Sequence, residues 1–445
     1  MLAAAAEVRG QGVALSRAGS GARAAGMGDA FVAVSDDGTA ASWNPAGLAQ
    51  LRQPEFSLVY VARDRGLALT GMRSADDLVS YSGTRSNFAN ASVDFASAAL
   101  PFSVARKPVT LQAGWHRLYE LGGSFGGDVD RVQTSSPGMV LGSVAHDDRV
   151  DGNIDVISAA GAVKLSAHTA LGGSVDFWRG DWQERISFAE SPGPDGAPAF
   201  LVNDSRQRVR GHNFTAGLLL TYPSWSAGLV YHSPFWSKFH LSGASRSTQS
   251  PSFDVDVPNA RFRFPRSIGA GVSHRMGARW MATADLTQDQ WTDALIDGLP
   301  GHSGPLNFFD SAPPALSTTR DTVSLNAGAE HLFVRDGVVV PVRFGLGWEP
   351  QGGMDPATRD PLDYFLVSAG AGYNTNRVKF DAAVQYRTGS FRSGTVLSVA
   401  TFLEGGVARD AIGRAFTHEW RVKFSAIYRI QDTDRLRAIL RKIFG

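Results

Sequence analysis

The chain contains no cysteine, which excludes disulfide bonds and thiolate metal sites. It also lacks any run of about 18 or more apolar residues, which excludes a transmembrane helix. Its 43 Lys and Arg residues balance 42 Asp and Glu residues, so overall charge favours neither nucleic acid nor an acidic partner. Glycine, by contrast, is abundant, with 49 copies in 445 residues, and favours turns, bulges and close packing over helices.

From Glu55 onward, apolar and polar residues alternate along many segments. In Val378–Arg387, every second residue from Val378 to Tyr386 is apolar, and the residues between include Lys379 and Asp381. Such alternation is typical of strands with one apolar face. The runs are about ten residues long, which suits a tilted strand that crosses a bilayer. Alternation alone also fits a soluble β-sandwich, so the connections must decide between the two.

The alternating segments fit about fourteen strands, predicted at residues 55–62, 91–102, 108–121, 153–166, 170–185, 208–221, 225–241, 262–275, 279–293, 321–334, 338–349, 362–374, 377–390 and 416–430. Short and long connections alternate along the chain. Short turns at one end and long loops at the other are typical of outer-membrane barrels, as is an even strand number. The sequence therefore predicts an all-β, 14-stranded antiparallel transmembrane β-barrel at 55–430, in the outer membrane of a Gram-negative bacterium.

Most tryptophans lie near the ends of the predicted strands, where an aromatic girdle would meet the membrane surface. They are Trp115, Trp178, Trp182, Trp225, Trp236, Trp280, Trp291, Trp348 and Trp420. Ordinary core packing is the alternative interpretation.

The segment Ser20–Leu51 does not alternate, is rich in Gly and Ala, and ends with Asn44-Pro45-Ala46-Gly47-Leu48. Small residues pack closely inside a barrel, so residues 1–54 are predicted to form a plug in the lumen. Asp36-Asp37-Gly38 lacks the acidic series of a calcium loop and indicates a turn. Met1–Glu7 is too short for a signal peptide; the end of a trimmed one and an artificial start both stay open.

At the other end, residues 431–445 have apolar residues at helical spacing among basic ones. This pattern predicts a basic amphipathic tail on the periplasmic side, and a frayed tail without a role is the alternative.

The segments Arg23–Gly28, Ala30–Ala33 and Asn44–Leu48 resemble the amino-terminal hatch of the FadL-type outer-membrane transporters of long-chain fatty acids and hydrocarbons. Two further patches, Phe264–Gly269 and Ser368–Tyr373, are similar to hairpins of the same family. The resemblance implies capture of a ligand by the long loops, an apolar lumen pocket, a hatch that rearranges, and lateral exit beside a kinked strand. The implied hatch residues are Arg23, Gly26, Met27, Gly28, Phe31, Trp43, Asn44, Pro45 and Ala46.

Glycine-rich positions in the third predicted strand are candidates for the kink, namely Gly114 or the pair Gly122 and Gly123. Two predicted loops carry apolar side chains that a soluble loop would not need, and these are expected to form the ligand entrance. They are Leu295, Ile296, Leu299, Val396, Leu397 and Phe402. Lumen cations such as Arg343, Lys379, Arg421 and Lys423 are expected to hold hatch and wall together through salt bridges.

No residue pattern selects a catalytic site, a metal or a cofactor. His232 and Ser233 are adjacent on one predicted strand, so their side chains point to opposite faces and cannot form a catalytic pair. The resemblance therefore implies a passive outer-membrane transporter whose partners are a hydrophobic small molecule and membrane lipid, with no nucleic acid. The alternative is a non-transporting barrel that serves as anchor or shuttle in a secretion system, and an outer-membrane enzyme is the third hypothesis. The sequence does not distinguish fatty acid from hydrocarbon.

Overall fold

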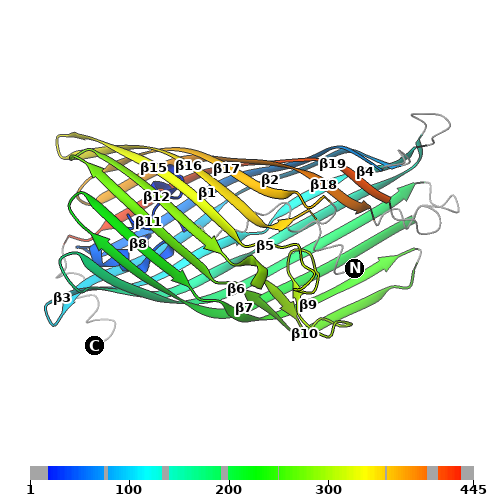
Figure 1. The fold of residues 1–445 in the computed structure, drawn as a ribbon, viewed down its shortest axis with the longest axis horizontal. Helices are drawn as coiled ribbons and strands as arrows, with labels where there is room; N and C mark the ends of the chain where they lie inside the picture. Colours follow the sequence, from blue (N-terminus) through cyan, green and yellow to red (C-terminus); the bar gives the residue numbers. More distant parts are fainter. Residues whose placement is uncertain are drawn as a thin grey trace.

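The computed structural model describes residues 19–74, 79–132, 140–191, 199–248, 250–355, 358–397 and 409–431, whose strands form one closed antiparallel barrel (Figure 1). The strands are β1 (Glu55–Ser74), β2 (Val79–Val104), β3 (Lys107–Glu120), β4 (Gly123–Val132), β5 (Val140–Lys164), β6 (Thr169–Ser191), β7 (Ala199–Thr221), β8 (Trp225–His232), β9 (Phe235–Ser247), β10 (Phe253–Phe264), β11 (Ser267–Met276), β12 (Trp280–Asp289), β13 (Leu295–Asp297), β14 (Leu306–Asn307), β15 (Thr322–Arg335), β16 (Val338–Met354), β17 (Pro361–Asn374), β18 (Val378–Leu397) and β19 (Arg409–Arg429). The helical elements are α2 (Ala22–Gly26), η1 (Ala40–Ser42), η2 (Pro45–Gln50) and η3 (Trp291–Asp293). No helix in the described ranges is long and apolar enough to cross a membrane.

These 19 strand elements form a barrel of 14 strands, because some elements that follow each other in the chain are parts of one wall strand. It closes where β1 pairs antiparallel with β19, in a ladder that runs from Glu55 opposite Arg429 to Ser74 opposite Ala411. The sequence prediction of fold and strand number is confirmed.

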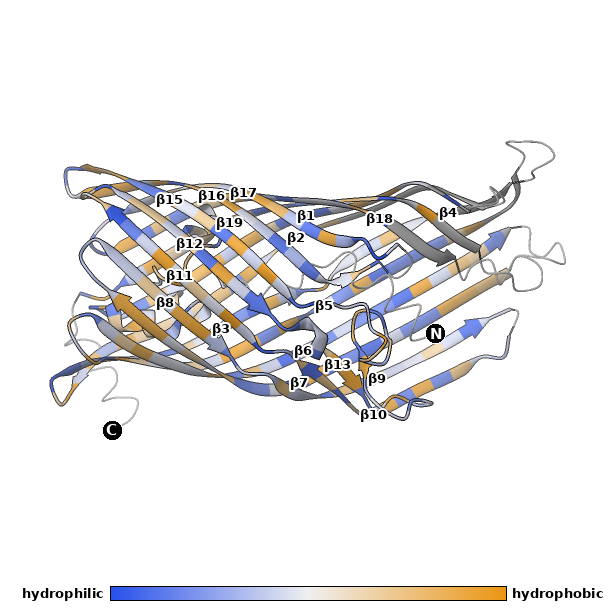
Figure 2. Cartoon of the chain, in the orientation of Figure 1, coloured by the Kyte–Doolittle hydropathy of each residue, from blue (hydrophilic) through white to orange (hydrophobic). Residues whose placement is uncertain are grey.

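Alternate side chains point to opposite sides of the wall. On β1, Phe56 and Leu58 are 49% and 50% exposed, whereas Val59 and Val61 are fully buried. Large apolar side chains are similarly exposed on most strands, and the alternation is visible along the ribbon in Figure 2. An apolar outer face of this kind suits contact with lipid rather than water.

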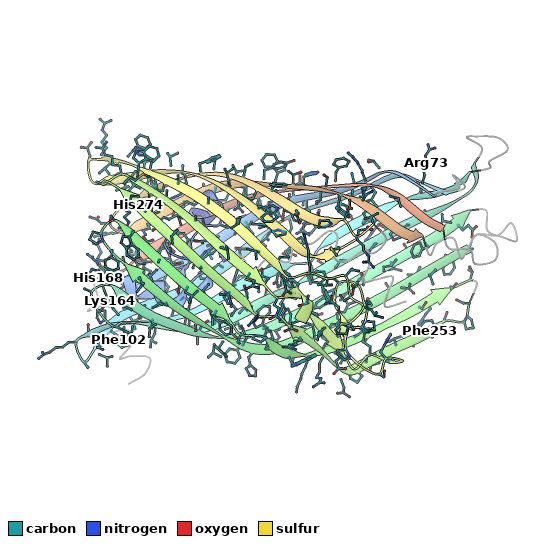
Figure 3. All side chains as sticks on the ribbon, in the orientation of Figure 1. Arg73, Phe102, Lys164, His168, Phe253 and His274 are labelled. Carbon is teal, nitrogen blue, oxygen red and sulfur yellow. The ribbon has the colours of Figure 1, made fainter. Side chains whose placement is uncertain are left out.

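Many strands are longer than the sequence predicted. The predicted loops 63–90, 122–152, 186–207 and 242–261 are wrong, because β1, β2, β4, β5, β6, β7, β9 and β10 extend through most of them. The outer faces of these extensions carry charges instead of apolar residues, so the period-two signal disappears although the backbone ladder continues. In Figure 3 the ends of the barrel are marked by His168 and His274 on the short-turn side and by Arg73 and Phe253 on the other.

Three predicted strands are interrupted. The predicted strand 225–241 is divided between β8 and β9 at Ser233-Pro234, and 262–275 between β10 and β11 at Pro265-Arg266. Proline has no backbone N–H to donate to a ladder, which explains both breaks. The third strand bends at Leu121-Gly122, between β3 and β4.

The predicted girdle is partly wrong. Trp225, Trp236, Trp280 and Trp420 are between 41% and 51% exposed on the outer face. Trp178 and Trp291 are instead buried, and Trp178 packs in the interior apolar cluster with Trp182 against it. Apart from Gln431, the predicted tail 431–445 lies outside the described residues.

Candidate functional site

The described part of the amino-terminal segment packs against inward-facing side chains from many strands. Helix α2 contacts β16, β17, β18 and β19, while η2 contacts β3, β5, β6 and β7. The backbone N–H groups of Phe31 and Val32 both donate to the Asp285 carboxylate, at 2.6 and 2.7 Å. The segment is thus held between walls that lie far apart in the sequence.

Glycines of the wall make room for this segment. A Cβ atom on Gly345 would lie 1.9 Å from the Gly28 nitrogen, and one on Gly328 would lie 2.4 Å from the Met27 oxygen. On another wall, a Cβ on Gly217 would lie 2.1 Å from the Asn44 Oδ1 atom. Backbone therefore meets backbone at Gly345 and Gly328, and at Gly217 the wall backbone meets the Asn44 side chain; a larger side chain would prevent these contacts.

Charges link the segment to the barrel. Arg23 pairs with Asp36 of its own segment and with Glu330 of β15, at 3.0 Å from Nη2 to Oε1. Glu330 also accepts from the Arg343 Nε atom at 2.7 Å, and Arg343 pairs with Asp381 at 2.7 Å. Burial by itself would raise the pKa of Asp36, but the charge of Arg23 holds that pKa below its ordinary value.

Three of the four predicted lumen cations form salt bridges, and two of these, Arg343 and Lys423, share a carboxylate with the amino-terminal segment. Arg343 belongs to the network of Glu330 and Asp381, and Arg421 bonds Glu419 at 2.8 Å. Lys423 lies 3.7 Å from Asp94, which accepts from the Ser20 hydroxyl of the amino-terminal segment. Lys379 has no ion pair with a carboxylate in the described ranges.

The predicted hatch residues all lie in this buried segment, and only Arg23 is partly exposed. Asn44 caps η2 by accepting from the Ala46 N–H at 3.1 Å and donates to the carbonyls of Val32 and Leu218. The Trp43 indole donates to the Ser20 carbonyl at 2.7 Å. Asn44 thus joins two turns of the segment to β7.

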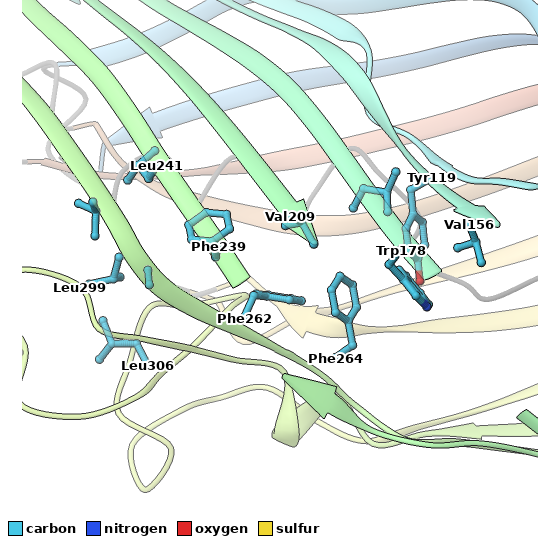
Figure 4. Packing of buried hydrophobic residues seen from close by; sticks show 13 residues of the cluster. Tyr119, Val156, Trp178, Val209, Phe239, Leu241, Phe262, Phe264, Leu299 and Leu306 are labelled. Carbon is cyan, nitrogen blue, oxygen red and sulfur yellow. The ribbon is translucent and has the colours of Figure 1, made fainter. Parts of the chain in front are cut away.

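Beyond this segment, toward the long-loop end, the lumen contains an apolar cavity of about 130 Å³. Figure 4 shows the buried apolar cluster to which Val209, Phe239 and Phe264 of its lining belong. Inward side chains of six strands and of the loop after β12 line it, and Glu184 is the one charged residue among them. The lining residues are Tyr119, Leu121, Val150, Ile154, Trp182, Glu184, Val209, Phe239, Phe262, Phe264, Trp291, Ile296 and Phe308.

Trp178 separates this cavity from a smaller one of about 60 Å³. Its ring centroid lies 4.7 Å from that of Phe264 and 6.4 Å from that of Tyr119, both of which line the larger cavity. Its indole N–H donates to Asn213 at 2.7 Å. Ala41 and Ser42 of the amino-terminal segment line the smaller cavity, together with polar wall residues.

Sequence reasoning missed Trp178 and its aromatic neighbours as site residues. On β6, outward positions are odd-numbered in this region, such as Val175 and Phe177, whereas Trp178 follows the polar inward positions Ser174 and Asp176. The available signal was an aromatic residue at an inward position of the strand, where the alternation otherwise places polar residues. Such residues mark a lumen that is apolar where a water-filled pore would be polar.

The hydrogen-bond ladder of the wall has a gap beside the small cavity. The β2–β3 ladder ends where Phe95 pairs with His116, and the β2–β4 ladder begins where Ser86 pairs with Phe125. Between these points β2 has no ladder partner in β3 or β4, and the β3–β5 register shifts between Arg117 and Tyr119. Gly122 and Gly123 lie at the bend that follows, whereas Gly114 lies in the paired part and lines the small cavity.

The predicted entrance residues divide into two groups. Leu295 and Leu299 are each 8% exposed, Ile296 lines the cavity, and the loop containing them packs on the β10 end. The second predicted loop is partly strand, because Val396 and Leu397 belong to β18 and pair with Asp410 and Arg409 of β19. Phe402 lies outside the described residues.

Within the described ranges, no group of three or more His, Asp or Glu side chains is arranged to hold a metal ion.

No family model and no curated protein matches the sequence. Solved structures do match. A Pseudomonas aeruginosa FadL homologue is 15% identical, over 94% of this chain and 99% of that one, with a TM-score of 0.69. The P. putida toluene transporter TodX is 14% identical, over 94% and 100%, with a TM-score of 0.58. The Ralstonia pickettii toluene transporter TbuX is 12% identical over the same shares, with a TM-score of 0.56. At these identities the likeness shows the fold, which is that of FadL-type barrels.

Proposed function

We propose that this chain, which shares the fold of the FadL homologue and the toluene transporters, is an outer-membrane channel for passive entry of small uncharged hydrophobic compounds. The observation that carries the proposal is the apolar lumen cavity between the long loops and the amino-terminal segment. A polar lumen would suit water and ions instead.

The cavity favours a hydrocarbon over a fatty acid. Its volume of about 130 Å³ approaches the 150 Å³ or so of an engineered apolar cavity that binds benzene. A fatty-acid carboxylate would find no cation among the lining residues and would meet the carboxylate of Glu184. The substrate class proposed is therefore a compound of about the size of one substituted benzene ring.

The proposed path starts at the loop around Leu299, which packs on the aromatic cluster of the cavity. It passes Trp178 into the small cavity and leaves sideways through the gap between β2 and the bend of β3 and β4. In this proposal the amino-terminal segment is a hatch that closes the direct route along the barrel axis.

Filling the cavity tests the binding step. Val209→Trp places a large side chain at a buried lining position, while Val175→Trp places the same side chain on the lipid-facing side of β6, at a position that is 45% exposed. We expect toluene entry into proteoliposomes to fall strongly for Val209→Trp and to stay unchanged for Val175→Trp. Equal entry through both variants, or preferred binding of decanoate over toluene, would contradict the proposed substrate class.

Closing the gap tests lateral exit. The chain has no native cysteine, so a bifunctional thiol reagent can join Val93→Cys to Arg117→Cys across the gap. The matched control is Ala98→Cys with Ala113→Cys, which are ladder partners in the paired part of the same two strands. We expect cross-linking to stop toluene transfer into the bilayer in the first pair only. Unchanged transfer in both pairs would contradict the lateral route.

If the intact protein binds no hydrocarbon and restores no uptake but co-purifies with a secretion component, the anchor or shuttle hypothesis is favoured instead. The apolar cavity has no evident use in such a role.

A further inference from the structure

A row of cationic side chains crosses the outer face of the barrel on four neighbouring strands. Arg179 of β6 is opposite Arg210 of β7, Arg210 is opposite Lys238 of β9, and Lys238 is opposite Arg261 of β10. Residues directly opposite in antiparallel strands share one face, with Cβ atoms about 5 Å apart. All four side chains are exposed. The sequence does not reveal this row, because its members are spread over more than 80 positions of the chain and only the register aligns them.

Two carboxylates bound the row: one is bonded by a cation outside the row, and the other by Arg261 at the end of the row. On the β5 side, Asp155 is the ladder partner of Arg179 but bonds Arg117 at 3.2 Å. On the β10 side, Asp297 bonds Arg261 at 2.5 Å. No carboxylate of the described residues forms an ion pair with Arg179, Arg210 or Lys238. The centre of the row is thus three adjacent cations without a direct ion pair; Asp181 attracts Arg210 but is itself bonded to Arg206.

The row lies at the edge of the apolar outer face that is nearer to the long-loop end of the barrel. Two residues before Arg179 on the same face is Phe177, which is 53% exposed; two before Lys238 is Trp236, at 41%. Phe214 is on the same face of β7 as Arg210 and is 53% exposed. The Trp236 ring also lies under the guanidinium groups of Arg261 and Arg263, at 5.0 and 6.0 Å. Aromatic residues at such a boundary lie at the level of lipid headgroups.

Charges farther along the same strands are arranged differently. Arg206 pairs with Asp181 at 2.7 Å, Arg185 with Asp204 at 3.5 Å, and Arg246 with Asp254 at 2.9 Å. Like charges directly opposite each other destabilise a sheet, and exposed strands can avoid the cost by such pairing. The central row has no such direct pairing, so a bound anion would lower the repulsion among its cations.

We propose that Arg179, Arg210 and Lys238 bind the phosphate groups of an acidic lipid of the outer leaflet, whose acyl chains pack on Phe177, Phe214 and Trp236. Guanidinium groups match phosphate oxygens in paired hydrogen bonds, and the lysine adds a point charge between them and β10. A lipid fits better than a soluble anion, because the cations border an apolar surface that a soluble anion would leave uncovered. This inference depends on the barrel standing in a membrane and not on what passes through its lumen.

The test compares two triple variants of the detergent-purified protein. Arg179→Gln/Arg210→Gln/Lys238→Gln removes the central row. Arg185→Gln/Arg206→Gln/Arg246→Gln removes three paired cations from the same three strands, β6, β7 and β9. Binding is measured to nanodiscs or mixed micelles that contain bisphosphorylated lipid A, with phosphatidylcholine as the neutral reference.

Each cation near an anionic surface is worth about a factor of five in affinity, so the first variant should bind lipid A about one hundredfold more weakly than wild type. The second should remain within about threefold of wild type, as paired charges contribute little. Wild-type binding should weaken with added salt for lipid A and not for phosphatidylcholine. Equal affinities of the two variants would overturn the proposal. Equally tight binding of a soluble polyphosphate would show a general anion site and overturn the assignment to lipid. Because the salt series uses unmodified protein, it decides the matter even if a variant does not fold.

Discussion

Arg387 shows how single residues hold the lumen together. Its guanidinium group is 1% exposed and bridges Glu349 of β16 and Glu419 of β19, with Glu419 at 3.2 Å. It also lies 4.9 Å from the centre of the Tyr364 ring. Glu419 accepts a further bond from Arg421 at 2.8 Å. A buried cation between two carboxylates fixes the relative position of strands on both sides of it.

Arg387→Met is expected to lower the free energy of unfolding by about 3–5 kcal/mol, because two carboxylates would lose a buried partner. The control is Arg392→Met, whose side chain is 63% exposed and whose pair with Asp360 should contribute less than about 1 kcal/mol. Urea unfolding in lipid vesicles measures both. If Arg387→Met loses no more unfolding free energy than the control, the buried ion pairs of Arg387 with Glu349 and Glu419 do not stabilise the barrel more than an exposed pair does.

Trp178→Ala is expected to join the two lumen cavities. Removing the indole also loses the bond to Asn213, and truncation of a buried aromatic costs about 3–5 kcal/mol. Toluene entry into proteoliposomes should be faster than in wild type, since the partition between the cavities is gone. Trp225→Ala, at a position 41% exposed to lipid, is the control and should leave entry unchanged. Slower entry through Trp178→Ala would mean that the indole binds the passing molecule rather than obstructs it.

At the scale of elements, the wall and the amino-terminal segment fit by backbone contact. The strands that meet the segment carry glycine where it approaches, as Gly345 does against Gly28 and Gly370 against Gly26. A side chain at such a point must displace either the segment or the strand. From residue 19 to the start of β1 the described part of the segment has no ladder partners, so it should be the part that moves.

Gly345→Ala is therefore expected to displace the segment, at a cost of about 1–3 kcal/mol in unfolding free energy. Single-channel conductance in a planar bilayer should rise above that of wild type. Gly304→Ala is the matched control, because a Cβ there meets no atom within 4 Å. If both variants keep the wild-type conductance, the segment does not obstruct the lumen at this contact.

At the scale of the whole molecule, barrel closure and lumen filling are separate. The ladders close the wall through β1 and β19 without the amino-terminal segment. The inward carboxylates and cations around that segment, such as Asp285 and Glu330, would become hydrated if it were absent.

Deletion of residues 20–46 is consequently expected to leave a folded barrel that is far leakier to small solutes. Heat-modifiable gel migration checks the fold, and liposome swelling in arabinose checks the leak. A deletion variant that swells no faster than the intact protein would show that the segment is not a plug.

Much of the fold follows from the sequence alone. Alternation along segments such as Val378–Arg387 indicated the strands and their lipid-facing sides, because the side-chain period of a strand is two residues whatever its neighbours are. The sorting of short and long connections indicated an outer-membrane barrel rather than a soluble sandwich. The small residues up to Leu48 indicated a segment that packs by its backbone, and the structure buries it.

Tertiary structure decided the rest, because it depends on register between strands distant in the sequence. The strand extensions are held by ladder pairing, which does not require apolar residues. The partition between the two cavities exists because Trp178, Phe264 and Tyr119 come together from three strands, and no local pattern predicts their meeting. The row of Arg179, Arg210 and Lys238 arises in the same way, from cross-strand alignment of residues that are each unremarkable in the sequence.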